Sequence, residues 1–167
     1  MEEHYEFDSP GLFNAFSVGA PGKRTFFLGI GEKDNWARIW LEKEHLEVLG
    51  PAIKQLFLAM AQRKINVPEE DKKREPEDHT PSGFPFVELE VEQISIGYED
   101  ELASIAMHVH GTGPEREAGA EVEGRVTLEQ LRELGQETES ICAAGRPRCK
   151  LCGQPIDPEG HVCPEQN

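Results

Sequence analysis

Three cysteines and one histidine near the carboxyl end of the chain have the types and spacing of metal ligands. Two residues separate Cys149 from Cys152, and Gly153 follows them. Glycine readily adopts the positive φ that the tight turn of a zinc knuckle requires. His161 and Cys163 come after the stretch QPIDPEG, which is able to reverse the chain direction. Thiolates and imidazole are the ligands that zinc prefers, so the pattern predicts a closed tetrahedral zinc site.

Two other interpretations of these cysteines stay open: they form a redox pair, or they have neither a metal-binding nor a redox role. A redox CxxC pair normally begins a helix inside a β–α–β unit, whereas Cys149 lies in a proline-rich segment. A catalytic zinc ion keeps one position for water, and four protein ligands leave none. We therefore expect a structural zinc ion and no catalytic residues in this cluster. The fourth cysteine, Cys142, is expected to be a core thiol in the last turn of a helix.

The acidity of the chain argues against several classes of partner. Its 167 residues include 32 acidic and 17 basic ones, which gives a formal net charge of -15 at pH 7. Basic and acidic residues cancel after position 145, so the excess negative charge lies in residues 1–145. Such a surface repels phosphate groups. We expect a protein partner, and neither nucleic acid nor a membrane; the sequence specifies no oligomeric state.

Hydropathy indicates a cytoplasmic protein. No apolar run approaches the roughly 20 residues that span a bilayer. The first residues, MEEHYEFD, lack the apolar core of a signal peptide. Cysteines are kept reduced in the cytoplasm, where thiolates remain available to a metal ion.

Apolar patterning predicts an α+β domain over residues 1–145, followed by a zinc-knuckle tail over 146–167. The domain consists of two halves, 1–65 and 86–145, joined by a linker at 66–85 that is rich in proline and charge. Each half has strands followed by a helix, which favours a two-layer antiparallel sheet with both helices on one face. The predicted strands cover 12–18, 25–30, 36–42, 86–98, 103–110 and 121–126, and the helical apolar faces run from Leu46 to Met60 and from Leu128 to Ile141.

Local signals refine this interpretation. The segments HLEVLG and QLRELG lie near the start of the two predicted helices, and aligning them places Gly50 opposite Gly135. This match favours a degenerate two-fold strand–strand–helix repeat. Thr127 with Gln130 three residues later is typical of a capping box. The apolar alternation of strand 86–98 changes phase near Glu92, which predicts a β-bulge there.

Two further groups of residues are candidates for binding or chemistry. His108 and His110 alternate with apolar residues, so both imidazoles lie on one side of a strand, where they serve as acid–base or metal groups or simply face solvent. Trp36, Arg38 and Trp40 share one face of another strand. Tryptophan and arginine are enriched at protein interfaces, so this stripe is either an interaction surface or a surface covered by a loop or the tail.

The motifs SVGAPGKRTFFL and AAGRPRCKLCGQPIDPEGHVCPEQN resemble the bacterial family known as domain of unknown function 3090, sometimes labelled "repeat protein". The resemblance covers nearly the whole chain. It implies cysteine or histidine at the positions of Cys149, Cys152, His161 and Cys163, but not at Cys142. No reaction comes with the resemblance. We therefore expect a non-enzymatic zinc-binding module that recognises a protein. An enzyme or small-ligand binder that uses the sheet face or a cleft is the alternative.

Overall fold

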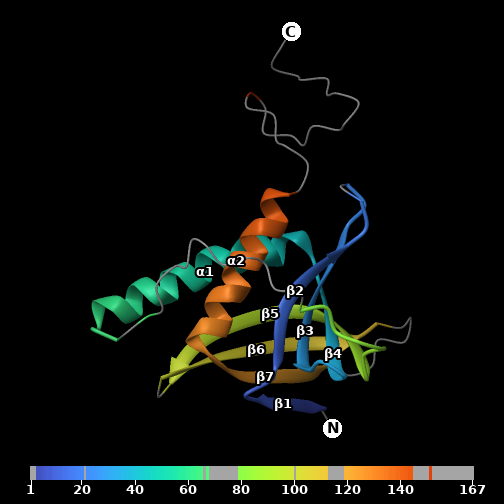
Figure 1. The fold of residues 1–167 in the computed structure, drawn as a ribbon, viewed down its shortest axis with the longest axis horizontal. Coiled ribbons are helices and arrows are strands. Elements are labelled where there is room, and N and C mark those ends of the chain that lie inside the picture. Colours follow the sequence, from blue (N-terminus) through green and yellow to red (C-terminus); the bar gives the residue numbers. More distant parts are fainter. Residues whose placement is uncertain are drawn as a thin grey trace.

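A computed structural model describes residues 3–20, 22–65, 67, 79–99, 101–112, 119–144 and 151 of the chain. Within these residues the chain forms strands and helices in the order expected of an α+β protein (Figure 1). Their bounds are β1 (His4–Asp8), β2 (Leu12–Val18), β3 (Thr25–Glu32), β4 (Asn35–Leu41), α1 (Lys43–Gln62), β5 (Val87–Glu99), β6 (Leu102–Gly111), β7 (Ala120–Thr127) and α2 (Leu128–Ala143).

The strands form one seven-stranded sheet in the order β1-β7-β6-β5-β4-β3-β2. The sheet is mixed rather than wholly antiparallel, because β1 runs parallel to β7 and β4 runs parallel to β5. Parallel neighbours need a long crossover, and α1 lies in the chain between β4 and β5. The α+β prediction is confirmed, and the two parallel pairs correct its antiparallel detail.

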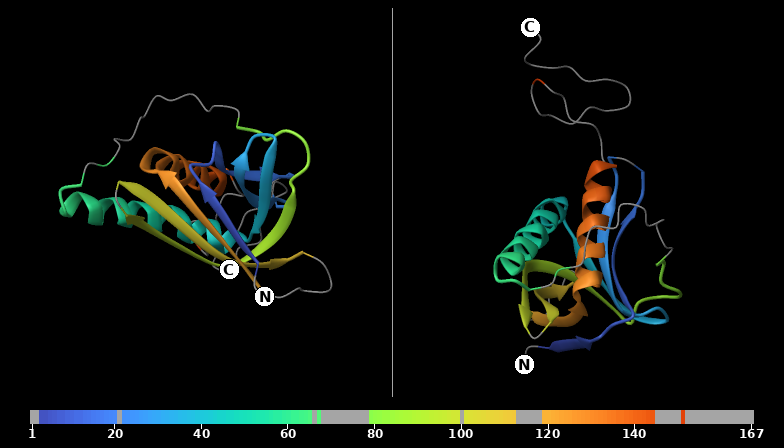
Figure 2. Two further views of the ribbon diagram at one scale, coloured as in Figure 1. Left: turned by 90° about the horizontal axis from the view of Figure 1, so that it is seen from below. Right: turned by 60° about the vertical axis from the view of Figure 1, so that its left-hand side comes forward.

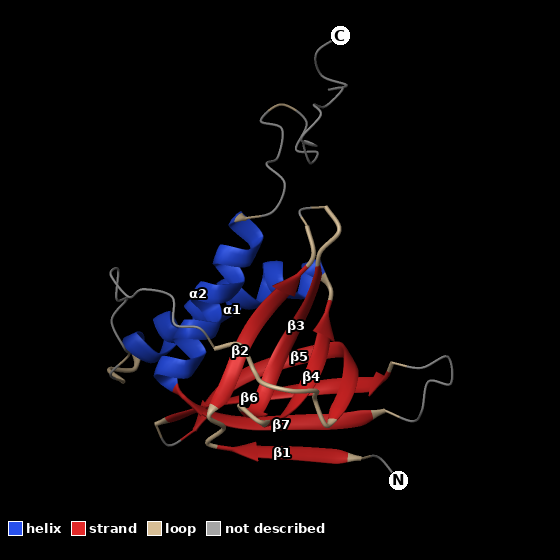
Figure 3. Cartoon of the chain, turned by 45° about the vertical axis from the view of Figure 1, so that its right-hand side comes forward, coloured by secondary structure: helices blue, strands red, loops and turns tan. Residues whose placement is uncertain are grey.

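Strong curvature lets the sheet enclose its own core. Figure 3 shows β2, β3 and β4 rising steeply across β5, β6 and β7. On the concave face, a Cβ atom added at Gly124 of β7 would lie 3.0 Å from Cδ1 of Ile30 in β3, although the two strands are not neighbours. Glycine at this position therefore permits close contact between opposite parts of the sheet.

Both helices pack against this concave face, as Figure 2 shows from two sides. Leu46, Leu49 and Ile53 of α1 join Leu131 and Leu134 of α2 in one buried core with the strands. These residues belong to the apolar faces expected from the sequence, so the placement of two helices over one face is confirmed.

The two helices cross at Gly50 and Gly135, the glycines at which the segments HLEVLG and QLRELG align. A Cβ atom at Gly50 would lie 3.2 Å from Oγ1 of Thr138, and one at Gly135 would lie 3.3 Å from Cγ2 of Ile53. Four strands, β1 to β4, precede the helix of the first half, and three strands, β5 to β7, precede the helix of the second. An internal duplication stays a prediction. The close packing of the two helices by itself explains why glycine occupies both positions.

Helix α2 runs along the outer edge of β2, a strand that ends the sheet (Figure 1). The Nδ2 group of Asn14 donates to Oε1 of Glu137 over 2.9 Å, and the Nε2 group of Gln130 donates to the carbonyl oxygen of Pro10 over 2.7 Å. Gln130 also completes the predicted capping box with Thr127. Side chains of α2 therefore cover the first part of this edge, whereas the end of β2 is exposed.

Part of the predicted organisation lies outside the described residues. Residues 68–78 of the linker and most of the tail, including all four predicted zinc ligands, belong to that part. The division into a domain and a tail therefore stays a prediction. Neither helix among the described residues is long and apolar enough to cross a membrane.

Candidate functional site

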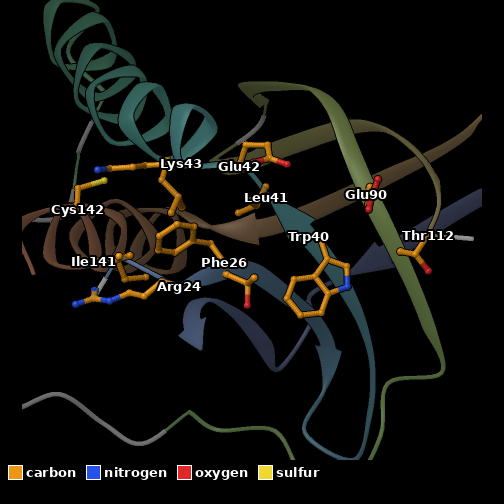
Figure 4. Close-up of a pocket in the computed structure, with 13 residues that line it drawn as sticks. Arg24, Phe26, Trp40, Leu41, Glu42, Lys43, Glu90, Thr112, Ile141 and Cys142 are labelled. Atoms are coloured by element: carbon orange, nitrogen blue, oxygen red, sulfur yellow. The ribbon is translucent and has the colours of Figure 1, made fainter. Parts of the chain in front are cut away.

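A pocket of about 460 Å³ opens where β3, β4 and the start of α1 meet the end of α2 (Figure 4). Its floor is apolar and its rim is charged, a combination typical of ligand and peptide sites. The apolar part includes Phe26, Trp40, Leu41, Leu46 and Ile141, and the polar part includes Arg24, Glu42, Lys43, Glu90, Thr112 and Cys142.

Arg24 fixes one side of this pocket. Its Nη2 group donates to the carbonyl oxygen of Ala144 over 2.6 Å, which joins the β2–β3 turn to the C-terminal end of α2. A cation at this end of a helix is favoured by the helix dipole. The predicted zinc segment continues directly from this anchor, because Cys149 follows Ala144 by five residues.

Cys142 lies at the boundary between this pocket and the core. It is half-buried, packs against the main core and also lines the pocket. Cys142 was expected to be a core thiol. It does contact the core, but it also lines the pocket.

On the opposite wall, Glu90 is held next to an imidazole. Nε2 of His110 lies 3.6 Å from Oε2 of Glu90 and 3.9 Å from Oε1 of Glu92, and the His110 side chain is only 12% exposed. Its Nδ1 atom is 2.9 Å from the carbonyl oxygen of Gly111, which places the proton on Nδ1. His110 itself does not line the pocket; it lies beside Glu90, which does.

The two candidate histidines do not form one site. His108 is exposed and lies opposite Glu121 in the sheet register, whereas His110 lies opposite Glu90. Among the described residues, a different group brings three metal-ligating atoms together: His4, Glu6 and Glu123, all exposed at the β1–β7 edge. Exposed groups of this kind are common without an ion, so they add no metal centre to the site.

The tryptophan–arginine stripe is largely packed inside the protein. Trp36 is 1% exposed and donates its indole N–H to the carbonyl oxygen of Ser82 over 3.2 Å. The guanidinium carbon of Arg38 lies 4.8 to 5.3 Å from the ring centroids of Phe27, Trp36 and Trp40. At Trp36 the structure agrees with the second alternative, a stripe covered by a loop, because the indole is buried and bonded to Ser82.

Arg38 stabilises the centre of the stripe. Its Nη1 group donates to Oε1 of Glu88 over 2.8 Å, so the cation is paired on one side and stacked on aromatic faces on the other. Trp40 is only half-buried and reaches the pocket. An interaction role therefore stays a prediction for Arg38 and Trp40, at the pocket rather than on an open sheet face.

Tryptophan fluorescence should separate the two indoles. In Trp40→Phe, the remaining Trp36 should emit at short wavelength and resist acrylamide, because almost none of its surface is accessible. In the matched variant Trp36→Phe, the remaining Trp40 should be quenched several-fold more strongly. Equal quenching constants in the two folded variants would contradict this arrangement.

These observations define a class of protein, an α+β domain in which a curved mixed sheet and two helices form a pocket, and which a cysteine-rich segment follows in the sequence. The family described as "Protein of unknown function (DUF3090)" matches residues 5–163, and the chain belongs to this family. No curated protein matches the chain, and neither does any solved structure.

Proposed function

We propose that this protein is a non-enzymatic, cytoplasmic zinc-binding module that recognises a partner protein. The observation that carries the proposal is the spacing of the four tail ligands Cys149, Cys152, His161 and Cys163. Four soft ligands without an open position suit a structural zinc ion. The contribution of zinc in this proposal is to hold the tail in one shape.

The position of the pocket supports a joint surface with the tail. Cys149 comes five positions after Ala144, and five residues span at most about 18 Å. The first zinc ligand is therefore tethered within reach of a pocket whose rim holds Glu42, Lys43 and Glu90. A partner segment with an apolar side chain and neighbouring polar groups fits such a lining.

Elemental analysis tests the metal. The purified full chain should contain about one zinc ion per molecule, and Cys152→Ser should lose it because a missing thiolate opens the tetrahedron. Cys142→Ser is the matched control and should keep the metal, since Cys142 is not one of the four ligands. The main melting transition should survive chelation, because the sheet and helices have their own core. A native preparation free of zinc, made without chelator or acid, would disprove the proposal.

A second function is favoured by the pairing of Glu90 with His110. A carboxylate on a pocket wall, next to a nearly buried imidazole, is a group suited to binding a small ligand or accepting a proton. In that case Glu90→Gln should abolish ligand binding while zinc content stays unchanged. For the interaction module, Glu90→Gln and Cys152→Ser should both weaken capture of the same partner from the native host.

A further inference from the structure

A second groove, which shares no lining residue with the pocket, lies between the two helices. Its volume is about 390 Å³, and its lining includes Ile53, Phe57 and Leu58 of α1, Val67 beyond it, and Arg132 and Gly135 of α2. The groove is mostly apolar, with a guanidinium group among its lining residues.

Arg132 is the unusual member of this lining. Its Nε and Nη1 atoms are shielded from solvent and have no hydrogen-bond partner in the described part of the chain. A guanidinium group stays protonated in proteins, so the cost of these unpaired donors is not relieved by loss of a proton. Shielded donors without partners are rare in folded proteins, and an unpaired one indicates a missing acceptor.

The carboxylate that shares the groove is already engaged elsewhere. Oε1 of Glu139 lies 2.5 Å from Nζ of Lys54, in an ion pair that joins α2 to α1. Glu139 therefore leaves Nε and Nη1 of Arg132 without an acceptor, in a residue that lines the groove together with Phe57 and Leu58. Leu58 is 64% exposed, so part of this apolar surface faces solvent.

We propose that this groove binds a small organic carboxylate with an apolar body. The carboxylate accepts hydrogen bonds from Arg132, and the hydrocarbon part covers Phe57 and Leu58. Charge complementarity selects an anion. The apolar walls favour a carboxylate with a hydrocarbon chain over a multiply charged phosphate, which would lose its hydration here without enough donors to replace it.

Octanoate is a suitable probe for the full-length, zinc-loaded chain. Calorimetry should show saturable binding, and the amide signals of Gly50 and Gly135 should shift in proportion to occupancy. Arg132→Gln should weaken binding at least tenfold, whereas Arg125→Gln, an exposed arginine on β7, should leave it unchanged. Octan-1-ol, which keeps the chain and lacks the charge, should bind at least tenfold more weakly than octanoate.

The exposed position of Leu58 supplies a second test that does not depend on Arg132. Leu58→Glu should weaken octanoate binding several-fold more than Leu58→Lys, because only the sign of the added charge differs. Equal affinity of the wild type and Arg132→Gln would overturn the proposal. So would equal effects of the two Leu58 substitutions, octanol binding as tight as octanoate, or shifts confined to Thr112 and Cys142 in the other pocket.

Discussion

Replacing Glu137 with glutamine should make the protein more stable at pH 8 and leave its stability almost unchanged at pH 4.5. The pKa of Glu137 is raised from its ordinary value of 4.5 to about 7. Burial is the largest cause and the nearby charge of Glu133 adds to it, while hydrogen bonds from Asn14 and the Ala15 backbone act in the opposite direction. Above pH 7 the folded protein must hold a partly buried anion. Glutamine keeps an acceptor for Asn14 without that charge.

The sign follows from proton linkage. A raised pKa means that the folded protein binds this proton more tightly than the unfolded chain does. The favourable contribution is therefore complete below pH 4.5 and is lost as the pH rises to about 7. We expect the free energy of unfolding of Glu137→Gln to exceed that of the wild type by about 1 to 3 kcal/mol at pH 8, the lower values reflecting partial solvent exposure.

Urea denaturation at a series of pH values measures this difference. Glu99→Gln, an exposed residue at the end of β5, is the control and should show no such pH-dependent gain. A constant difference between Glu137→Gln and the wild type from pH 4.5 to pH 8 would show that Glu137 does not titrate in this range.

Truncating Leu134 to alanine should destabilise the fold by about 2 to 5 kcal/mol, since it removes buried methyl groups and leaves a cavity. Leu134 is fully buried in the core that α2 shares with α1 and the sheet. Leu58→Ala is the matched control, because the same atoms are removed from a side chain that is 64% exposed. Chemical denaturation should place Leu58→Ala within about 0.5 kcal/mol of the wild type. Comparable losses for both variants would contradict the assignment of the buried face.

The sequence was informative where one local pattern determines the outcome. Apolar periodicity identified both helices and the strands from β2 to β7, and the change of phase near Glu92 corresponds to a register shift between Val91 and Gln93. Strand β1 was missed. Its alternating Tyr5 and Phe7 are a signal, but the segment is short, and its pairing partner β7 lies more than a hundred residues away in the chain.

The candidate site was less accessible to sequence reasoning. The pocket combines Arg24 from a turn, Glu90 from β5 and Cys142 from α2, and no periodicity relates such distant positions. The burial of Trp36 depends on Ser82, which belongs to a segment that had been assigned to the linker. Alternation placed Trp36, Arg38 and Trp40 on one face correctly, but it carries no information on what lies over that face.

The position of α2 along β2 has a consequence for self-association. An uncovered edge strand presents unpaired N–H and C=O groups to which another chain can add a strand. Helix α2 covers the first part of the β2 edge at one end of the sheet, whereas β1 at the other end relies on exposed charged residues such as Glu6 and Asp8. The two ends of the sheet are therefore protected by different means, by the packing of a helix at β2 and by charged side chains at β1.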